Sequence, residues 1–306
     1  MAVKNVKIES MFYKDDRVFG NNLTNIIEKT EAVLENCNKI KEESNAVINN
    51  PQECEEYREE IELFTKSLER LYMPKANYMI IHADINEKMR AILVDWMVDV
   101  GLKFKLKDDT LFLGVNIVDR FLERQITKRE QLQLVGVTAM FIASKYEEIY
   151  PPEIKDFIYI CDNAYTKSEI IIMERQMLKV LNYNLNITST YRYLKCYNRV
   201  INPGPKAYNM ALYLIELALV EYKFIKYKPS LCAASALYIS NRLINKDLEW
   251  NIKAANTIGY QEHELKKCAK ELAMMTQGAS TLNAVKRKYA QSKYMAISNI
   301  KIGKRS

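Results

Sequence analysis

Few residues in the sequence have the types and spacing that catalysis requires. His82 and His263 lie far apart, and His263-Glu264 lacks the second histidine of an H-E-x-x-H zinc motif. The sequence has no glycine-rich phosphate loop and no G-x-S-x-G nucleophile elbow. The adjacent acids Glu147 and Glu148 are typical of a solvated helix surface. We therefore expect a non-enzymatic protein that acts by binding and needs no cofactor or metal.

Charged residues inside apolar segments are more informative. Arg90 interrupts the stretch MRAILVDWMVDV at 89–100, and a buried guanidinium is costly unless it is paired. Asp119, in the apolar segment VNIVDRFL, is the natural counter-charge, so we expect a structural Arg90–Asp119 pair that locks two helices together. Lys145 and Glu174 both border apolar positions. They are either ordinary exposed charges or a charge pair beside an apolar contact surface.

The stretch at 89–100 also raises a packing question. Wound at about 100° per residue, it places Ile92 and Trp96 on one broad apolar face and Val94 and Val98 on a second. A surface helix needs only one such face. The helix is therefore either buried all round or keeps one face for a partner.

The composition is typical of a globular protein with long helices. The chain has 306 residues, of which 48% are hydrophobic, with only 8 glycines and 7 prolines. Its six cysteines form no C-x-x-C pair and the N-terminus has no signal-like apolar run, so we expect free thiols in the cytosol or nucleus. Charges interrupt every apolar run well before the roughly 18 residues of a membrane span, so no membrane contact is expected.

Apolar periodicity and composition divide the chain into five segments of an all-α protein. We expect a disordered tail at 1–50, an N-terminal helix at 51–74, a five-helix unit at 75–186, a second five-helix unit at 187–280 and a basic extension at 281–306. The net charge of +7 is concentrated in that extension. It is interpreted as a solvated tail, and no groove-reading element accompanies it, so we do not expect nucleic-acid binding.

Capping signals predict where helices begin. Asp84 precedes Glu87 by three residues, and T-x-x-E capping boxes begin at Thr127 and Thr166. Two segments rich in small residues, LVGVTAMFIAS at 134–144 and SLCAASALYIS, predict one central helix in each five-helix unit. Small residues favour this position because they let neighbouring helices approach closely.

Several tracts resemble the cyclin box in order and spacing. They are MRAILVDW at 89–96, VDRFL at 118–122, LQLVG at 132–136, ASKYEEIYPPE at 143–153 and LKVL at 178–181, and SKY at 292–294 resembles the end of mitotic A/B-type cyclins. The resemblance implies two tandem five-helix cyclin-box domains. It also implies a nuclear and cytoplasmic regulatory subunit that activates a cyclin-dependent Ser/Thr protein kinase and recruits substrates at the G2/M transition.

The resemblance implies a kinase-binding surface in the first domain. Cyclins of this type press the αC helix of the kinase inward, which completes a Lys–Glu ion pair and frees the activation loop. Lys145 and Glu174 would be the polar pair of that contact. The apolar residues around them would be Ile142, Tyr146, Leu178, Tyr183 and Leu185. Tyr146 and Tyr183 stand where the family commonly has phenylalanine.

The resemblance also implies a surface that docks Arg-x-Leu motifs of substrates and inhibitors. Its apolar and polar residues would be Met89, Ile92, Leu93, Trp96, Leu132 and Gln133. Asp99 stands where the family often has glutamate, and it would pair with the arginine of the motif. The shorter Asp99 side chain is expected to alter the affinity for the motif.

A third resemblance lies in the N-terminal tail. RVFGNNLTN at 17–25 is similar to a destruction box, the degradation signal that the ubiquitin ligase machinery of mitotic exit reads. Arg17, Leu23 and Asn25 would be its residues, but Gly20 replaces the leucine of the fourth position. The alternative is an Asn-rich tail that matches by chance.

Two other classes of function compete with kinase activation. General transcription-initiation factors use the same two-domain fold on DNA, and the basic C-terminus would then give salt-sensitive binding to duplex DNA. The Lys145/Glu174 pair and the docking residues argue against that reading. An enzyme in its own right has no motif in its favour.

Overall fold

The computed structural model describes residues 57–246, 250, 252–276 and 282–300. Every regular element in this part of the chain is an α-helix or a short 3-10 turn, which confirms the all-α prediction. The described part of the chain divides into two units, with the boundary between Leu71 and Tyr72. In the first unit, helix α2 (Arg58–Leu68) lies within the predicted N-terminal helix. The predicted tail at 1–50 lies outside the described residues.

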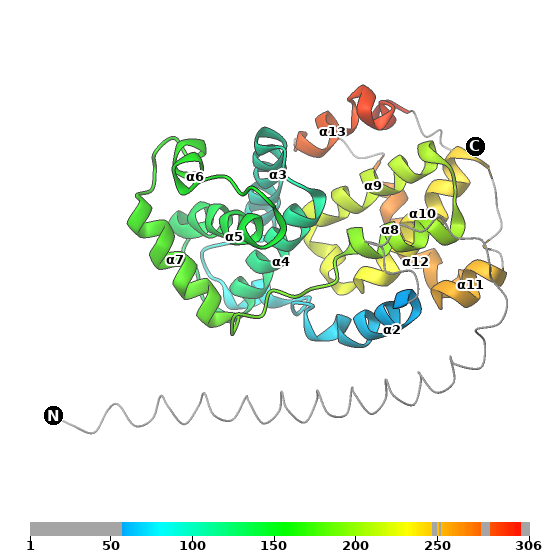
Figure 1. Cartoon of the computed structure of the whole chain (residues 1–306), viewed down its shortest axis with the longest axis horizontal. Coiled ribbons are helices and arrows are strands. Elements are labelled where there is room, and N and C mark those ends of the chain that lie inside the picture. Colours follow the sequence, from blue (N-terminus) through cyan, green and yellow to red (C-terminus); the bar gives the residue numbers. More distant parts are fainter. Residues whose placement is uncertain (1–56, 247–249, 251, 277–281, 301–306) are drawn as a thin grey trace, which may run out of the picture. The chain divides into compact units, whose positions relative to one another are not determined.

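The second unit begins with a bundle of five helices. They are α3 (Glu87–Phe104), α4 (Asp108–Arg124), α5 (Leu132–Glu147), α6 (Ile154–Ile160) and α7 (Lys167–Val180) (Figure 1). The central helix is α5, which contacts each of the other four, as its small residues predicted. The predicted capping box forms at the start of α7, where Thr166 and Glu169 each accept a hydrogen bond from the other's main-chain N–H.

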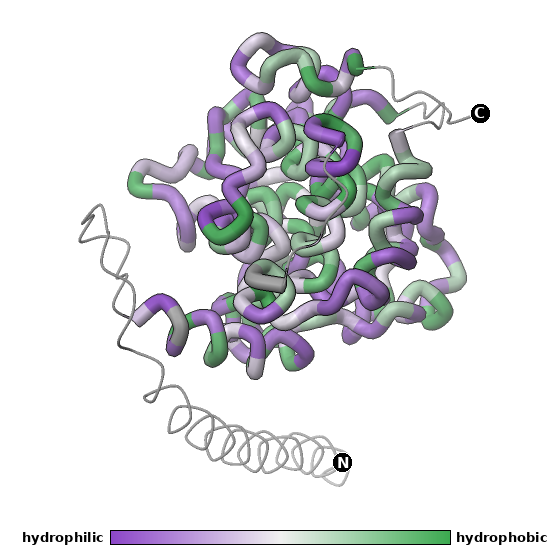
Figure 2. Tube along the Cα trace, turned by 90° about the vertical axis from the view of Figure 1, so that its right-hand side faces the viewer, coloured by the Kyte–Doolittle hydropathy of each residue, from purple (hydrophilic) through white to green (hydrophobic). Residues whose placement is uncertain are grey.

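A second bundle of five helices follows. It consists of α8 (Thr190–Ile201), α9 (Pro205–Val220), α10 (Pro229–Ile244), α11 (Ile252–Ile258) and α12 (Glu262–Met275). The predicted central helix α10 contacts α8, α9 and α12, whereas α11 packs on α8. Hydrophobic residues concentrate on the inner helices and hydrophilic residues on the outer turns (Figure 2). The tandem arrangement of two five-helix bundles is therefore as predicted.

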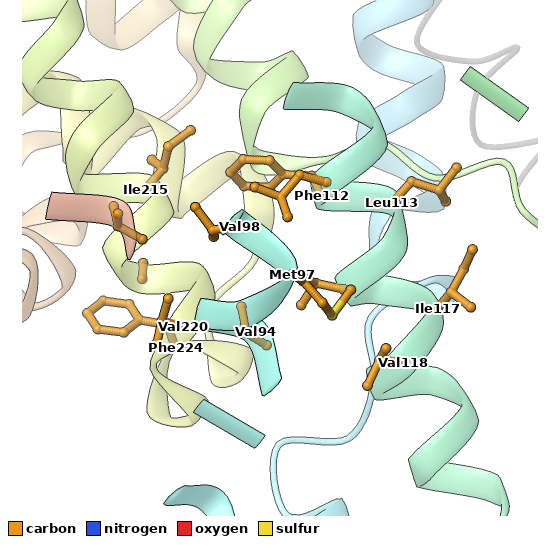
Figure 3. Packing of buried hydrophobic residues seen from close by; sticks show 14 of the residues in the cluster. Val94, Met97, Val98, Phe112, Leu113, Ile117, Val118, Ile215, Val220 and Phe224 are labelled. Atoms are coloured by element: carbon orange, nitrogen blue, oxygen red, sulfur yellow. The ribbon is translucent and has the colours of Figure 1, made fainter. Parts of the chain in front are cut away.

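Helix α3 lies where the two bundles meet. Val94, Met97 and Val98 of α3 are buried between α4, whose Phe112 lies beside Val98, and the end of α9, which contributes Val220 (Figure 3). The two apolar faces of the 89–100 stretch thus have different neighbours. One face closes the boundary between the bundles, and the other remains at the surface of the first bundle.

Two predicted helix starts are wrong. The cap of α3 is Asn86, whose side chain accepts a hydrogen bond from the Met89 N–H, while Asp84 accepts one from the main-chain N–H of Arg129. No capping box forms at Thr127, which is buried and donates its hydroxyl to a carbonyl oxygen two residues earlier. A 3-10 turn then precedes α5. In both places a tertiary or loop contact engages the side chain that local spacing had assigned to a cap.

The described part of the basic segment, residues 282–300, is not the solvated tail that the charge of 281–306 indicated. It contains helix α13 (Ala284–Tyr289), which contacts α3 and α9. Val285 and Tyr289 are buried, and so is Ile297 further on. Lys288 is buried as well, because acidic side chains of both bundles surround its ammonium group. Apolar residues placed between the basic ones therefore fold this segment onto the domain.

Candidate functional site

Lys145 and Glu174 form an ion pair on one surface of the first bundle. Lys145 lies in the last turn of α5, and its ammonium group donates to the carboxylate of Glu174 in the neighbouring helix α7. The same ammonium lies 4.1 Å from the ring centroid of Phe141, a cation–π contact. The side chains of the pair are 40% and 15% exposed. A partner can therefore reach both charges without unfolding either helix.

The residues expected around this pair do not all lie at the surface. Tyr146 and Tyr183 are exposed, and Leu178 and Leu185 are half-buried. Ile142 is only 3% exposed, so its assignment to the contact surface is corrected. It faces inward because α5 is the central helix, enclosed by its four neighbours. Ile142 is therefore part of the hydrophobic core beneath this surface.

Two exposed apolar residues close to Lys145 in the chain were not predicted as part of this surface. Ile149 and Tyr150 follow Glu148, the residue that caps the end of α5. Large apolar side chains beside the polar residues of an otherwise solvated segment were the available signal. These two residues add exposed apolar area just beyond the end of α5.

The end of α5 is fixed by the two acids that sequence alone assigned to solvent. Glu148 accepts hydrogen bonds from the Lys107 N–H, at 2.7 Å, and from the Thr110 hydroxyl, which ties it to the start of α4. Glu147 lies 3.8 Å from Arg192 of the second bundle. Partial burial raises the pKa of Glu147, and the nearby Arg192 guanidinium opposes that rise. Both acids therefore position the surface that carries Lys145.

The residues assigned to the docking surface lie at two depths. Ile92 is 58% exposed, Gln133 is exposed, and Met89 and Trp96 are half-buried. Three of them lie on α3 and Gln133 lies at the start of α5, and these two helices are in contact. They are available to a peptide.

Leu93 and Leu132 are corrected from surface to core. Both are buried. Leu93 packs so closely on α5 that a Cβ atom placed on Gly136 would lie 2.6 Å from its Cδ1 atom. Leu93 therefore forms the floor beneath the docking surface. The absence of a side chain at Gly136 allows this approach, and helical geometry alone could not reveal it.

The acidic end of the docking surface is already engaged within the chain. Asp99 accepts two hydrogen bonds from Nη2 of Arg287 in α13, at 2.6 and 2.8 Å. One turn earlier, Asp95 accepts a hydrogen bond from the Ala284 N–H, at 3.0 Å. Burial raises the pKa of Asp95, although the Ala284 hydrogen bond acts in the opposite direction. The position of Asp99 beside the docking residues was predicted from the sequence, but neither contact with α13 was.

Arg90 and Asp119 form a buried ion pair with two N–O distances of 2.7 Å. Tyr78 donates its hydroxyl to the same carboxylate, and Arg90 also donates to the carbonyl oxygens of Leu219 and Val220 at the end of α9. Burial alone would lower the pKa of Arg90, but Asp119 outweighs burial and raises it. The pair therefore locks α3 to α4, and it also joins the first bundle to the second.

The remaining predicted site has no structural counterpart in the described residues. Arg17, Leu23 and Asn25 of the proposed destruction box lie outside them. Within the described part of the chain, no three His, Cys, Asp or Glu side chains cluster as metal ligands would. No helix of that part is long and apolar enough to cross a bilayer.

The fold corresponds to one known class of protein. Residues 60–186 match the family described as "Cyclin, N-terminal domain", and residues 188–302 match "Cyclin, C-terminal domain". The chain belongs to the cyclin family. Within that family its relatives are B-type cyclins, which confirms the mitotic assignment and narrows it from A/B to B.

Three of these relatives show how far the similarity extends. The chain is 42% identical over 253 residues to the G2/mitotic-specific cyclin-B of Marthasterias glacialis, covering 82% of this chain and 65% of that protein. It is 44% identical over 255 residues to the corresponding protein of Hydra vulgaris, covering 83% and 70%. It is 38% identical over 290 residues to Cyclin-B2-2 of Oryza sativa subsp. indica, covering 93% and 67%. The chain spans about two thirds of the length of these relatives.

Solved structures support the fold independently. A viral cyclin from herpesvirus saimiri superposes with a TM-score of 0.63 at 21% identity, over 70% of this chain and 96% of that one. A chain of the yeast RNA Pol II CTD kinase CTDK-1 complex gives a TM-score of 0.52 at 14% identity, over 69% and 68%. At these identities the likeness concerns the fold alone.

Proposed function

We propose that the chain is the regulatory subunit that binds and activates a cyclin-dependent Ser/Thr protein kinase at the G2/M transition. The observation that carries the proposal is the similarity, over most of the chain, to proteins named G2/mitotic-specific cyclin-B. Cyclins are non-catalytic regulatory subunits, so the chain contributes no reacting group of its own. Its contribution is a binding surface that stabilises the active conformation of the kinase.

The surface around Lys145 and Glu174 is suited to grip a helix of the kinase. The Lys145 ammonium and the less exposed Glu174 carboxylate can bond to main-chain groups of the partner, while Tyr146 and Tyr183 offer exposed apolar area. A kinase αC helix held in this way is pushed inward, and its glutamate then pairs with the catalytic lysine. Binding energy at the surface thus shifts the kinase equilibrium toward the active state.

An activation assay tests this proposal. The purified chain is titrated into a cyclin-dependent kinase subunit, and phosphorylation of a basic Ser-Pro peptide is measured. The double variant Lys145→Ala/Glu174→Ala is expected to need at least about tenfold more protein for half-maximal activation, equivalent to about 1.4 kcal/mol of binding free energy. Absence of activation by the wild type, or an unchanged titration curve for the variant, would contradict the mechanism.

The second bundle provides a matched control for that variant. Lys226 and Glu271 form an ion pair of 2.9 Å whose side chains are 41% and 23% exposed, and Lys226 also lies 4.8 Å from the ring centroid of Tyr227. The double variant Lys226→Ala/Glu271→Ala therefore removes the same charges from a similar environment outside the proposed surface. It is expected to activate the kinase like the wild type.

The docking surface would recruit substrates and inhibitors that carry Arg-x-Leu motifs. Helix α3 provides accessible apolar groups on Met89, Ile92 and Trp96. The adjoining helix α5 provides the exposed amide group of Gln133. A leucine side chain would be buried there, and Asp99 would face the arginine of the motif. This recruitment would raise the local concentration of substrate at the kinase.

Degradation and localisation belong to the same proposal. A destruction box at 17–25 would deliver the protein to the ubiquitin ligase machinery of mitotic exit, and the protein would act in nucleus and cytoplasm. Arg17→Ala is expected to lengthen its half-life through mitosis, measured after a translation block. An unchanged half-life would reject the motif. Fluorescence of a tagged chain in dividing cells tests the localisation.

A DNA-binding scaffold has weaker support than kinase activation. That reading relied on the basic C-terminus, yet Arg287 and Lys288 both form ion pairs with acids of the same chain. A charge that is neutralised within the protein releases few counterions from DNA.

A further inference from the structure

Helix α13 contacts the acidic end of the docking surface at two positions that lie about one helical turn apart on each helix. Asp95 and Asp99 are four residues apart on α3, and Ala284 and Arg287 are three residues apart on α13, so each pair lies on one face of its helix. The Ala284 N–H meets Asp95, and the Arg287 guanidinium meets both oxygens of Asp99. Both acids beside the docking surface are therefore occupied from within the chain.

The position of α13 does not depend on Arg287. Lys288 donates to Asp108 at 2.6 Å and also to Glu216, and Tyr289 donates to Glu216 at 3.0 Å. Val285, Lys288 and Tyr289 are buried. These contacts fix the helix to both bundles, so the Arg287 side chain can leave Asp99 without displacement of α13.

The Arg287–Asp99 pair itself is weakly held. The two side chains are 65% and 43% exposed, and exposed ion pairs contribute little because water screens them. A peptide arginine placed beside Asp99 would form the same kind of pair that Arg287 already makes. Replacement of Arg287 by the peptide arginine would therefore add almost no binding free energy.

We propose that Arg287 is a specificity-determining residue of the docking surface, because it occupies the acidic subsite that would otherwise reward an arginine in the docking motif. This inference rests on the proposed docking function. Peptides are then selected mainly by the apolar residue that contacts Ile92 and Trp96. The arginine of an Arg-x-Leu motif contributes little to their affinity.

Two peptides that differ at a single residue test the inference. A fluorescent peptide with one Arg-x-Leu motif and its Ala-x-Leu counterpart are titrated with the full chain, and the ratio of their dissociation constants is measured. For the wild type the ratio is expected to be below about two. In Arg287→Ala it is expected to rise about two- to fivefold, the range of an exposed ion pair. Adding Asp99→Asn to that variant is expected to restore the wild-type ratio.

Lys286→Ala is the matched control. Lys286 is also exposed, carries the same charge and directly precedes Arg287 on α13. It is expected to leave the ratio unchanged. An unchanged ratio in Arg287→Ala, or an equal rise in Lys286→Ala, would overturn the inference while leaving the docking function intact. Failure of both peptides to bind wild type and variants alike would overturn the docking function itself, and this inference with it.

Discussion

Arg90 holds Asp119 through two parallel hydrogen bonds of 2.7 Å, and the same guanidinium reaches carbonyl oxygens at the end of α9. A single side chain thus satisfies a buried carboxylate in one bundle and two main-chain acceptors in the other. The pair is architectural, because both side chains are buried and a partner cannot reach them.

Removal of Arg90 is therefore expected to destabilise the whole protein. Arg90→Ala leaves the Asp119 carboxylate buried with Tyr78 as its remaining hydrogen-bond donor, which should cost about 3–5 kcal/mol in free energy of unfolding. Tyr78→Phe removes only one hydrogen bond to the carboxylate and should cost about 1–3 kcal/mol. Urea denaturation followed by circular dichroism measures both. A loss in Arg90→Ala no larger than in Tyr78→Phe would show that the pair is not the main link.

The apolar part of the docking surface can be tested at its most exposed residue. Ile92→Ala is expected to weaken binding of an Arg-x-Leu peptide by about 1–2 kcal/mol, roughly five- to thirtyfold, because the lost methylene and methyl groups would be buried by the peptide. Ile80, which is 80% exposed outside this surface, gives the control variant Ile80→Ala. Fluorescence polarisation measures both affinities. Equal losses in the two variants would argue against a localised docking surface.

The buried acid beneath α13 predicts a dependence of stability on pH. Burial raises the pKa of Glu216 to about 7 from its ordinary 4.5, although Lys288 acts in the opposite direction. Between these values the folded protein retains a proton that the unfolded chain has lost. Stability from this group is therefore complete below pH 4.5 and is lost as the pH rises to 7, by about 3 kcal/mol.

The comparison with Glu216→Gln isolates this effect, because every other titrating group is shared. Urea denaturation from pH 5 to 8 should show the wild type losing stability relative to Glu216→Gln as the pH rises. Lys288 retains Asp108 as its partner in the variant. A wild type that gains stability relative to the variant over this range would show that the ionised pair, and not burial, dominates.

Two helical glycines are expected to respond in opposite directions to the same substitution. Gly136→Ala places a methyl group against Leu93 and should destabilise the protein by about 1–2 kcal/mol, because the packed leucine must shift. Gly101→Ala meets nothing within 4 Å and should stabilise α3 by about 0.5–1 kcal/mol. Thermal melts of the two variants provide the measurement. A melting temperature for Gly136→Ala at or above that of wild type would contradict the close packing of Leu93.

Features that depend on residues close together in the chain could be predicted from the sequence, whereas several contacts between distant segments could not. Apolar periodicity and the Thr166 capping box depend on residues a few positions apart, and these predictions agree with the structure. Arg90 and Asp119 were paired from the cost of burying a charge. Leu93 and Ile142 were misplaced because both lie on apolar helices, and only the neighbouring helices decide which side becomes surface. The contact between Asp99 and Arg287 spans 188 residues, and no local pattern indicates it.

The ties between α13 and the first bundle also constrain the order of folding. Asp108, at the start of α4, and its partner Lys288 are 180 residues apart in the chain. Even if a nascent chain folds the five helices of its first bundle early, Asp99 and Asp108 have no α13 partner at that stage. Their partners Arg287 and Lys288 become available only when α13 has emerged from the ribosome. Contacts of such high sequence separation form late because loop closure must come first. Until then Asp99 remains unpaired, so a growing chain and a finished one present different charges to the same peptide.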